Sequence, residues 1–192
     1  MFEVLGVVWL PAQFQVANAV LILIFVPLFS GVLEPFVRRF TQVTAMRKMG
    51  LGFFLAGLAF LVPSFIEMRI AEGQTPNIVW QLLAYTLLTA AEVLVSVTGL
   101  ELFYSQAPNR MKSLMLAAWF LSVVLGNVFT SAVNFAILAP DGSSRLSGTG
   151  YYLFFAVAML VTAALFVPVA RRFRVRTYIQ GAEAAEAAAE LR

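Results

Sequence analysis

Residues 92–113 read EVLVSVTGLELFYSQAPNRMKS, and they begin with an acid inside an apolar run that extends from about Ile78 to Phe103. A run of this length is sufficient for a helix that crosses a bilayer. The middle of the run falls near residue 91, so Glu92 would lie close to the membrane midplane. A carboxylate there costs roughly 2.5–3.5 kcal/mol unless it faces a protein interior or water. The stretch therefore predicts a transmembrane helix with a central acid that needs a partner or a function.

The composition of the whole chain indicates the same class of protein. Of its 192 residues, 61% are hydrophobic and only 12% are charged, whereas soluble proteins carry about 25% charged residues. We therefore expect an all-α integral membrane protein in a lipid bilayer, because helices satisfy their own backbone hydrogen bonds there. The formal charge of +3 comes with basic residues at predicted helix ends, so it indicates membrane topology and no nucleic-acid partner.

The residue types that the chain lacks restrict its chemistry. It has no Cys and no His, which excludes disulfides, Cys or His metal sites, Cys nucleophiles and His general bases. We also find no glycine-rich phosphate loop, paired carboxylates or nucleophile constellation, so neither an enzyme nor a cofactor is expected. Any proton coupling must then depend on a carboxylate.

Five apolar segments are candidates for transmembrane helices. They run over about residues 14–31, 49–65, 78–103, 113–138 and 151–170. These spans predict a transmembrane bundle over residues 1–176, followed by a tail at 177–192. The first 13 residues are apolar but too short to span, so we expect them at the membrane interface.

The basic residues predict the orientation of these spans. All Lys and Arg except Arg69 and Arg145 follow the first, third or fifth span. Because cytoplasmic loops carry the excess of Lys and Arg, the C-terminal tail is expected to be cytoplasmic and the N-terminus outside. The sequence thus predicts a multi-pass protein of the cell (plasma) membrane.

Three segments resemble one known family. GLELFYSQAPNRMKS, preceded by the acid of EVLVS, is similar to the signature of the proton-dependent oligopeptide transporter family, within the major facilitator superfamily. LPAQFQVANAV resembles the segment that enters the family's eighth helix, and GLGFFLAGLAF resembles its ninth. The resemblance covers nearly the whole chain and implies the C-terminal part of such a transporter, helices eight to twelve. The N-terminal helices one to seven would then be missing from this chain.

A polar stripe marks the candidate site on the third span. Tyr85, Thr89, Glu92, Ser96 and Gly99 recur at spacings of four, three, four and three, which places them on one face of an α-helix. Such a stripe is typical of a helix that lines a cavity. The alternative is that hydrogen bonds between helices hold Glu92 for packing only. We favour a functional role, because the other acids lie in loops, tails or helix ends.

Four residues are candidates for substrate binding, three of them through the resemblance and Ser96 through its spacing from Glu92. Glu92 matches the acid that binds the peptide's amino terminus and responds to protonation, and Asn18 matches an asparagine that contacts the peptide backbone. The family commonly has proline after that asparagine, whereas this chain has Ala19. Trp119 matches a tryptophan of the substrate pocket, although by itself it would be read as a packing aromatic. Ser96 could hydrogen-bond Glu92 or substrate, or equally its own helix backbone.

Two functions follow from these observations. The first is a segment of a proton-coupled secondary active transporter, a symporter for di- and tripeptides, with Glu92 as the proton-coupling group. Its partners would be peptides, protons and the missing N-terminal helices. The alternative is a truncated or accessory helical bundle that transports nothing and binds a partner protein. A transporter site needs facing helices, and five helices alone do not form both of its walls.

Overall fold

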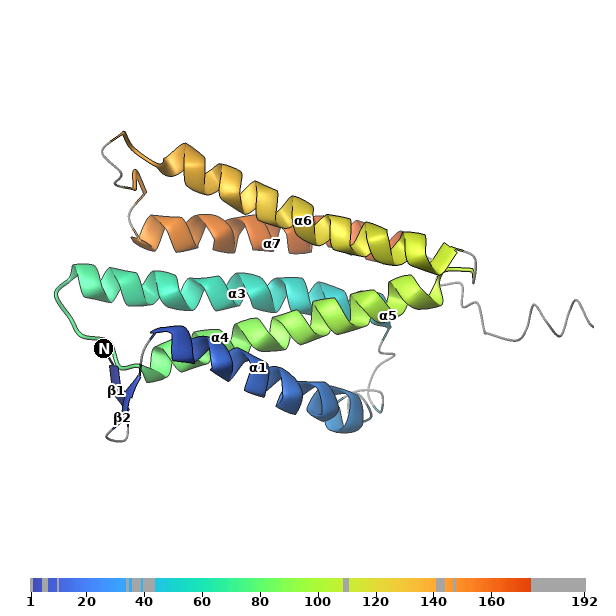
Figure 1. Cartoon of the computed structure of the whole chain (residues 1–192), viewed down its shortest axis with the longest axis horizontal. Helices are drawn as coiled ribbons and strands as arrows, with labels where there is room; N and C mark the ends of the chain where they lie inside the picture. Colours follow the sequence, from blue (N-terminus) through green and yellow to red (C-terminus); the bar gives the residue numbers. More distant parts are fainter. Residues whose placement is uncertain are drawn as a thin grey trace, which may run out of the picture. The chain divides into compact units, whose positions relative to one another are not determined.

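The structure is a computed structural model that describes residues 2–4, 7–9, 11–33, 35, 39, 44–108, 111–140, 144–146 and 148–173. Its elements are strands β1 (Phe2–Val4) and β2 (Val7–Trp9), helices α1 (Pro11–Leu28), α3 (Ala45–Ala71), α4 (Val79–Glu92), α5 (Thr98–Ser105), α6 (Lys112–Ile137) and α7 (Gly148–Arg172), and π-helices η1 (Phe29–Leu33) and η2 (Val93–Val97) (Figure 1). The two strands pair antiparallel, with Phe2 opposite Trp9. Apart from one short hairpin and an isolated bridge between Leu138 and Ser144, the regular secondary structure of the described residues is therefore helical.

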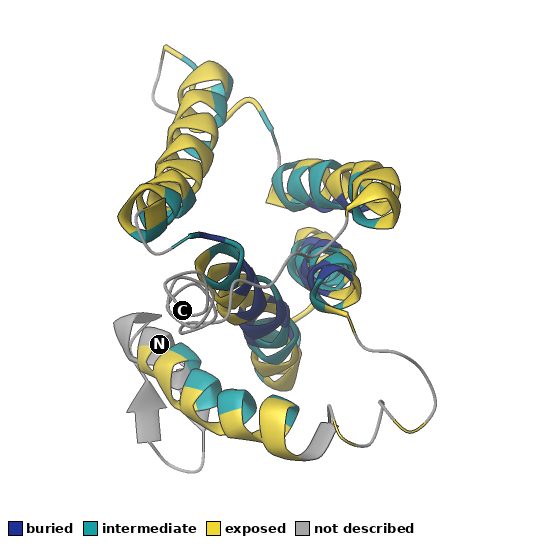
Figure 2. Cartoon of the chain, turned by 90° about the vertical axis from the view of Figure 1, so that its right-hand side faces the viewer, coloured by how far each residue is buried: buried dark blue, intermediate teal, exposed yellow. Residues whose placement is uncertain are grey.

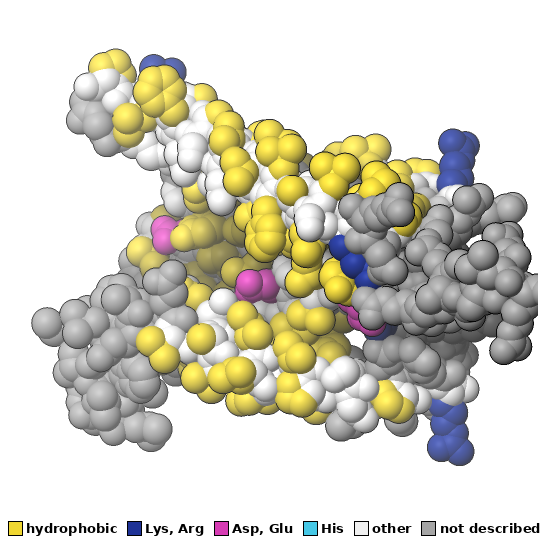
Figure 3. All heavy atoms as spheres, turned by 45° about the vertical axis from the view of Figure 1, so that its right-hand side comes forward, with side chains coloured by type: hydrophobic (Ala, Val, Ile, Leu, Met, Phe, Trp, Pro, Cys, Tyr) yellow, Lys and Arg dark blue, Asp and Glu magenta, His cyan; other side chains and the backbone are white. Residues whose placement is uncertain are grey.

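Four stretches of the described residues are long and apolar enough to cross a membrane. They are Ala45–Ala71, Val79–Ser105, Lys112–Ile137 and Gly148–Arg172, and a shorter apolar helix covers Asn18–Gly31. The five predicted spans thus correspond to helical segments, although the first is too short to meet the same criterion of length. Figure 3 shows hydrophobic side chains spread along the helices of the visible face, as expected for surfaces in contact with lipid.

The chain divides into two compact units, each described here by itself. The first comprises Met1–Val97 and Leu146–Arg171, and the second comprises Thr98–Arg145 and Arg172–Arg192. The first unit contains α1, α3, α4, η2 and nearly all of α7, whereas α5 and α6 belong to the second. The predicted tail at 177–192 lies outside the described residues.

The core of the first unit lies where α3 packs against α4 and η2. Small residues are buried on both sides, including Gly52 and Ala59 on α3 and Ala84 and Ala91 on α4; Figure 2 colours buried positions dark blue. Small residues let helix backbones approach closely, which strengthens packing in a membrane, where the hydrophobic effect does not bring helices together. A Cβ atom built on Gly52 would lie only 2.6 Å from Val95 Cγ2. Helix α3 therefore approaches the segment directly after Glu92 closely at Gly52.

Helix α7 packs antiparallel on another part of α3. The rings of Phe53 and Phe166 meet edge to face with centroids 5.0 Å apart. The hydroxyl of buried Ser64 donates to the Thr149 carbonyl oxygen at 3.1 Å. As residue numbers rise along α3 they fall along α7, which establishes the antiparallel direction. Aromatic contacts and one interhelical hydrogen bond thus fix α7 to the helix that supports α4.

In the second unit, α5 packs against α6. The rings of Phe103 and Trp119 lie 5.4 Å apart, and the Lys112 ammonium lies over the Tyr104 ring at 4.6 Å. None of the residues of α6 is buried within the described chain. Its apolar side chains therefore remain available to lipid or to other helices.

Candidate binding site around Glu92

Glu92 is the last residue of α4, and the π-helix η2 begins at the next residue. In a π-helix the backbone bonds join residues five apart, and such turns frequently occur at functional sites. Three of the five residues of η2 are valines, whose branched side chains lower α-helical propensity. The change of helix type thus coincides with the acid that the sequence singles out.

Asn18 joins α1 to Glu92 and Thr89 on α4. Its amide nitrogen Nδ2 donates to Glu92 Oε2 at 3.3 Å, and its carbonyl oxygen Oδ1 accepts from Thr89 Oγ1 at 2.5 Å. Thr89 and Glu92 are three residues apart, so both lie on one face of the helix. Two helices separated by more than 70 positions in the sequence therefore meet through a chain of three polar side chains.

Burial decreases along this chain of polar side chains, from Thr89 through Asn18 to Glu92. Thr89 is 0% exposed, Asn18 is half-buried and Glu92 is exposed. An ionised carboxylate accepts hydrogen bonds on both oxygens, and the described contact from Asn18 uses Oε2. Among the described residues, the cluster can therefore hold the carboxylate through Oε2 and leave its other oxygen for a donor such as an ammonium group.

Ser96 does not continue the predicted polar stripe in the expected way. It lies within η2, so the α-helical spacing used for the prediction applies from Tyr85 through Glu92 and not beyond. Ser96 is exposed, whereas Gly99 is buried. The structure thus brings Asn18 and Glu92 together, while a role for Ser96 in binding stays a prediction.

Trp119 belongs to the second unit and packs on Phe103, with an angle of 63° between the ring planes. Its side chain is partly exposed. This contact agrees with the packing role that we expect for an isolated aromatic residue. Its role in a substrate pocket stays a prediction that follows from the resemblance.

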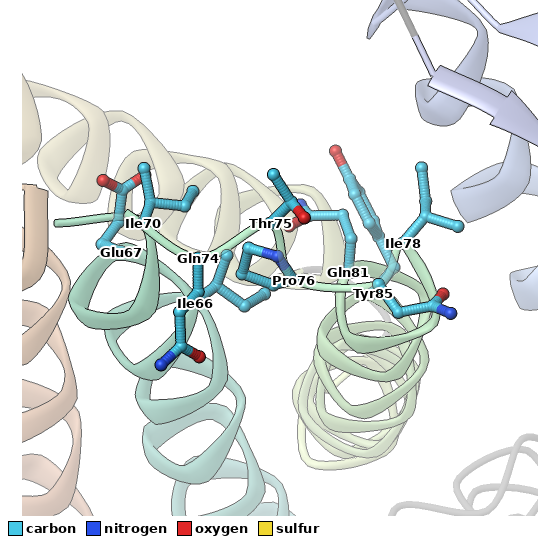
Figure 4. Close-up of a pocket in the computed structure, with 10 residues that line it drawn as sticks. Ile66, Glu67, Ile70, Gln74, Thr75, Pro76, Ile78, Gln81 and Tyr85 are labelled. Carbon is cyan, nitrogen blue, oxygen red and sulfur yellow. The ribbon is translucent and has the colours of Figure 1, made fainter. Parts of the chain in front are cut away.

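A pocket of about 480 Å³ lies between the end of α3 and the start of α4, and the sequence analysis did not predict it. It is lined by Ile66, Glu67, Ile70, Gln74, Thr75, Pro76, Asn77, Ile78, Gln81 and Tyr85 (Figure 4). Gly73, two residues after the end of α3, adopts a positive φ of 78°, a backbone conformation that favours glycine. Tyr85 lies one helical turn before Thr89 and so connects the pocket to the polar stripe.

Acidic residues in the described part of the chain do not gather into a group that could hold a metal ion. The polar groups of the site are one carboxylate, one amide and one hydroxyl. This set suits recognition of a hydrogen-bond donor or a cation. It offers no paired acid and base for a hydrolytic reaction.

These features define a multi-pass helical membrane protein with a polar cluster around an acid within a membrane span. A sequence model described as "POT family" matches residues 3–145, and the chain belongs to this family. It is 36% identical over 122 residues to solute carrier family 15 member 1 of Oryctolagus cuniculus, and 27% identical over 165 residues to the peptide transporter PTR2 of Saccharomyces cerevisiae. These alignments cover 63% and 79% of this chain.

Solved structures show the same fold. The crystal structure of an auto-inhibited POT family peptide transporter superposes with a TM-score of 0.85 over 94% of this chain, at 31% identity. The structure of the POT family transporter PepTSo gives a TM-score of 0.73 over 86% of the chain, at 34% identity. The prediction of an all-α membrane protein resembling this transporter class is confirmed. These relatives are named as transporters, which agrees with the prediction that the chain is not an enzyme.

The chain spans only part of the length of the relatives it matches. It covers 16% of the rabbit protein and 26% of the yeast protein. It covers 36% and 35% of the two solved transporter chains.

Proposed function

We propose that this chain is a segment of a proton-coupled symporter for di- and tripeptides, and that it corresponds to helices eight to twelve of such a transporter. The observation that carries the proposal is the 3.3 Å hydrogen bond between Asn18 and Glu92. The resemblance names these two residues independently as substrate-binding positions on different helices, and the fold brings them into one cluster. The relatives named as peptide transporters support the same function.

Glu92 would bind peptide in its ionised form. The carboxylate would accept a hydrogen bond from the ammonium group of the peptide while Asn18 donates to Oε2 from the protein side. Protonation removes the negative charge and one acceptor position, so it would weaken the contact with the ammonium group. Peptide and proton would therefore compete for Glu92, so protonation of Glu92 would favour release of the peptide during alternating access around a midplane site.

The proposal includes further helices that face Glu92. The acid is exposed within the described chain although it belongs to an apolar span, and a charge in that position is tolerated where it faces protein or a water-filled cavity. This chain covers only 16–36% of the relatives named above, and the rest of such a transporter could form the other wall of the binding site, opposite Glu92. We therefore propose the N-terminal helices of the transporter as the partner of this segment.

The first prediction concerns whether this segment transports by itself. Proteoliposomes that contain only the 192 residues are expected to show no proton-driven dipeptide uptake above empty vesicles, because one wall of the site would be missing. If the coding sequence continues in frame upstream through about seven further spans, the protein that contains those spans together with this segment, here called the joined transporter, should show saturable uptake driven by a proton gradient. Failure of the joined transporter to transport peptide would favour the accessory bundle. Saturable uptake by the segment alone would show that the 192 residues are sufficient for transport.

The second prediction concerns the orientation in the membrane. We propose that residues 171–192 face the cytoplasm and residues 139–150 face outside, from the distribution of Lys and Arg. The chain has no native Cys, so single cysteines introduced as Ser143→Cys and Gln180→Cys report one position each. An impermeant thiol reagent applied to intact cells should label the first variant and not the second. The opposite pattern would reverse the orientation.

A further inference from the structure

We propose that Thr89 is a positioning residue for Glu92: its hydroxyl holds the Asn18 amide in the orientation that aims Nδ2 at the carboxylate. The inference deepens the proposed function, because it assigns to Thr89 the control of how Glu92 meets the ammonium group of a peptide. The inference is based on two hydrogen bonds in series, from Thr89 to Asn18 and from Asn18 to Glu92.

Burial is the first observation in favour of this role. Thr89 is fully buried, and no larger side chain of the described residues is buried to that extent. A buried hydroxyl needs a hydrogen-bond partner, since an unsatisfied polar group is costly away from water. The partner here is the Asn18 carbonyl oxygen at 2.5 Å. The hydroxyl of Thr89 is thus enclosed by the protein and directed at α1.

The choice of partner is the second observation. Threonine hydroxyls within helices commonly bond to the carbonyl four residues earlier in the same helix. Thr86, on the same helix, does so with Leu82 at 2.8 Å, and Thr162 does so with Ala158 at 2.8 Å. Thr89 instead donates to a side chain on α1, 71 positions away in sequence. Its hydroxyl therefore connects two helices, which its neighbour Thr86 does not do.

The two ends of the Asn18 amide explain why the hydrogen bond from Thr89 affects Glu92. A primary amide has a donor end and an acceptor end, and a rotation by half a turn exchanges them. With the carbonyl held by Thr89, the NH₂ group of Asn18 is the end that meets Glu92 Oε2. Without the hydroxyl, the carbonyl could turn toward the ionised carboxylate, and two acceptors would then repel each other. Thr89 thereby selects the amide orientation that stabilises an ionised Glu92 and leaves its second oxygen for substrate.

The test compares variants that separate the hydroxyl from the volume of the side chain. Thr89→Val and Thr89→Ala both remove the hydroxyl but differ in size, whereas Thr89→Ser keeps the hydroxyl and loses only a methyl group. Each variant is made in the full 192-residue chain, purified in lipid, and checked for helicity by circular dichroism. Infrared spectroscopy then records the carboxylate stretching band that disappears in Glu92→Gln.

We expect this band to shift in Thr89→Val and Thr89→Ala and to keep its wild-type position in Thr89→Ser. An unshifted band in both hydroxyl-free variants, at unchanged helicity, would overturn the proposal. A shift in Thr89→Ser as large as in Thr89→Val would also overturn it, because the effect would then come from packing. If one hydroxyl-free variant does not fold, the other provides the same comparison.

A second measurement separates this inference from the proposed function. In the joined transporter, loss of one interhelical hydrogen bond next to the substrate should raise the KM for dipeptide roughly three- to tenfold, with little change in kcat. Thr89→Ser should restore the wild-type KM. A band shift that serine restores, together with an unchanged KM in Thr89→Val, would support positioning of Glu92 by Thr89 and would contradict peptide binding by Glu92.

Discussion

Replacement of Glu92 by glutamine is expected to weaken dipeptide binding roughly ten- to a hundredfold in a transporter that contains this chain. The reason is the charge of the carboxylate. A hydrogen bond to a charged group contributes about 1.5–3 kcal/mol, and glutamine offers the ammonium group of a peptide only a neutral acceptor. Equilibrium binding of a dipeptide to wild type and Glu92→Gln, measured across pH, gives the comparison directly.

The design of this variant separates charge from shape. Glutamine has nearly the same size, and its carbonyl oxygen can still accept from Asn18 Nδ2, which contacts Glu92 Oε2 at 3.3 Å in the native chain. Glu92→Asp keeps the charge on a shorter side chain, so it should lose less affinity than Glu92→Gln. Affinity in wild type should fall with acidification as the carboxylate is protonated, and Glu92→Gln should lack this dependence. Equal affinity and equal pH dependence in both proteins would make Glu92 a packing residue.

The helical fold could be predicted largely from hydropathy. The fourth apolar segment, predicted at 113–138, is α6 at Lys112–Ile137. The second, predicted at 49–65, extends in the structure from Ala45 to Ala71. The longer helix includes polar ends such as Arg47 and Arg69, which hydropathy excludes but helix formation tolerates, because these side chains can reach water at the interface.

Glu92 and Asn18 could be proposed as site residues from the sequence, whereas the hydrogen bonds that link them to Thr89 could not. An acid in the middle of an apolar run is visible in the sequence because of its cost, and Asn18 was identified through the resemblance. The direction of the Thr89 hydroxyl was not predictable. Its helical neighbour Thr86 has the same residue type and bonds to its own backbone, whereas the partner of Thr89 depends on the position of α1 in space.

The π-helix η2 was also missed, and with it the true position of Ser96. The sequence pattern was read with α-helical spacing throughout, whereas residues 93–97 adopt the wider turn. Local sequence contains only a weak signal for such a turn. In the structure, η2 lies where Gly52 permits close approach of α3, so tertiary packing accompanies the irregularity. A polar stripe through a long membrane helix therefore predicts one face reliably only over a few turns.

This close approach leads to the second large expected effect, in the variant Gly52→Ala. The added Cβ would lie 2.6 Å from Val95 Cγ2 and 3.1 Å from the Ala91 carbonyl oxygen. Because the carbonyl belongs to a helix backbone, α3 and α4 would have to move apart. Overpacking of this kind typically costs about 1–3 kcal/mol. Since Ala91 and Val95 flank Glu92 in sequence, we expect weaker peptide binding as well as lower stability.

Gly50→Ala provides a matched control two residues away on the same helix. A Cβ at Gly50 would lie 3.6 Å from the nearest atom, Phe166 Cδ1, which is an ordinary van der Waals contact. Alanine is favoured over glycine inside a helix by roughly 0.5–1 kcal/mol, so this variant should be slightly stabilised. Equilibrium unfolding in mixed micelles should therefore give opposite signs for the two substitutions. Adding Val95→Ala to Gly52→Ala should recover part of the stability, because it removes the nearest collision and leaves those with the Ala91 carbonyl oxygen and Leu94 Cβ, both at 3.1 Å. If Gly52→Ala proves as stable as Gly50→Ala, α3 does not approach the segment after Glu92 as closely as the structure indicates, and the support that this contact gives to the site would be lost.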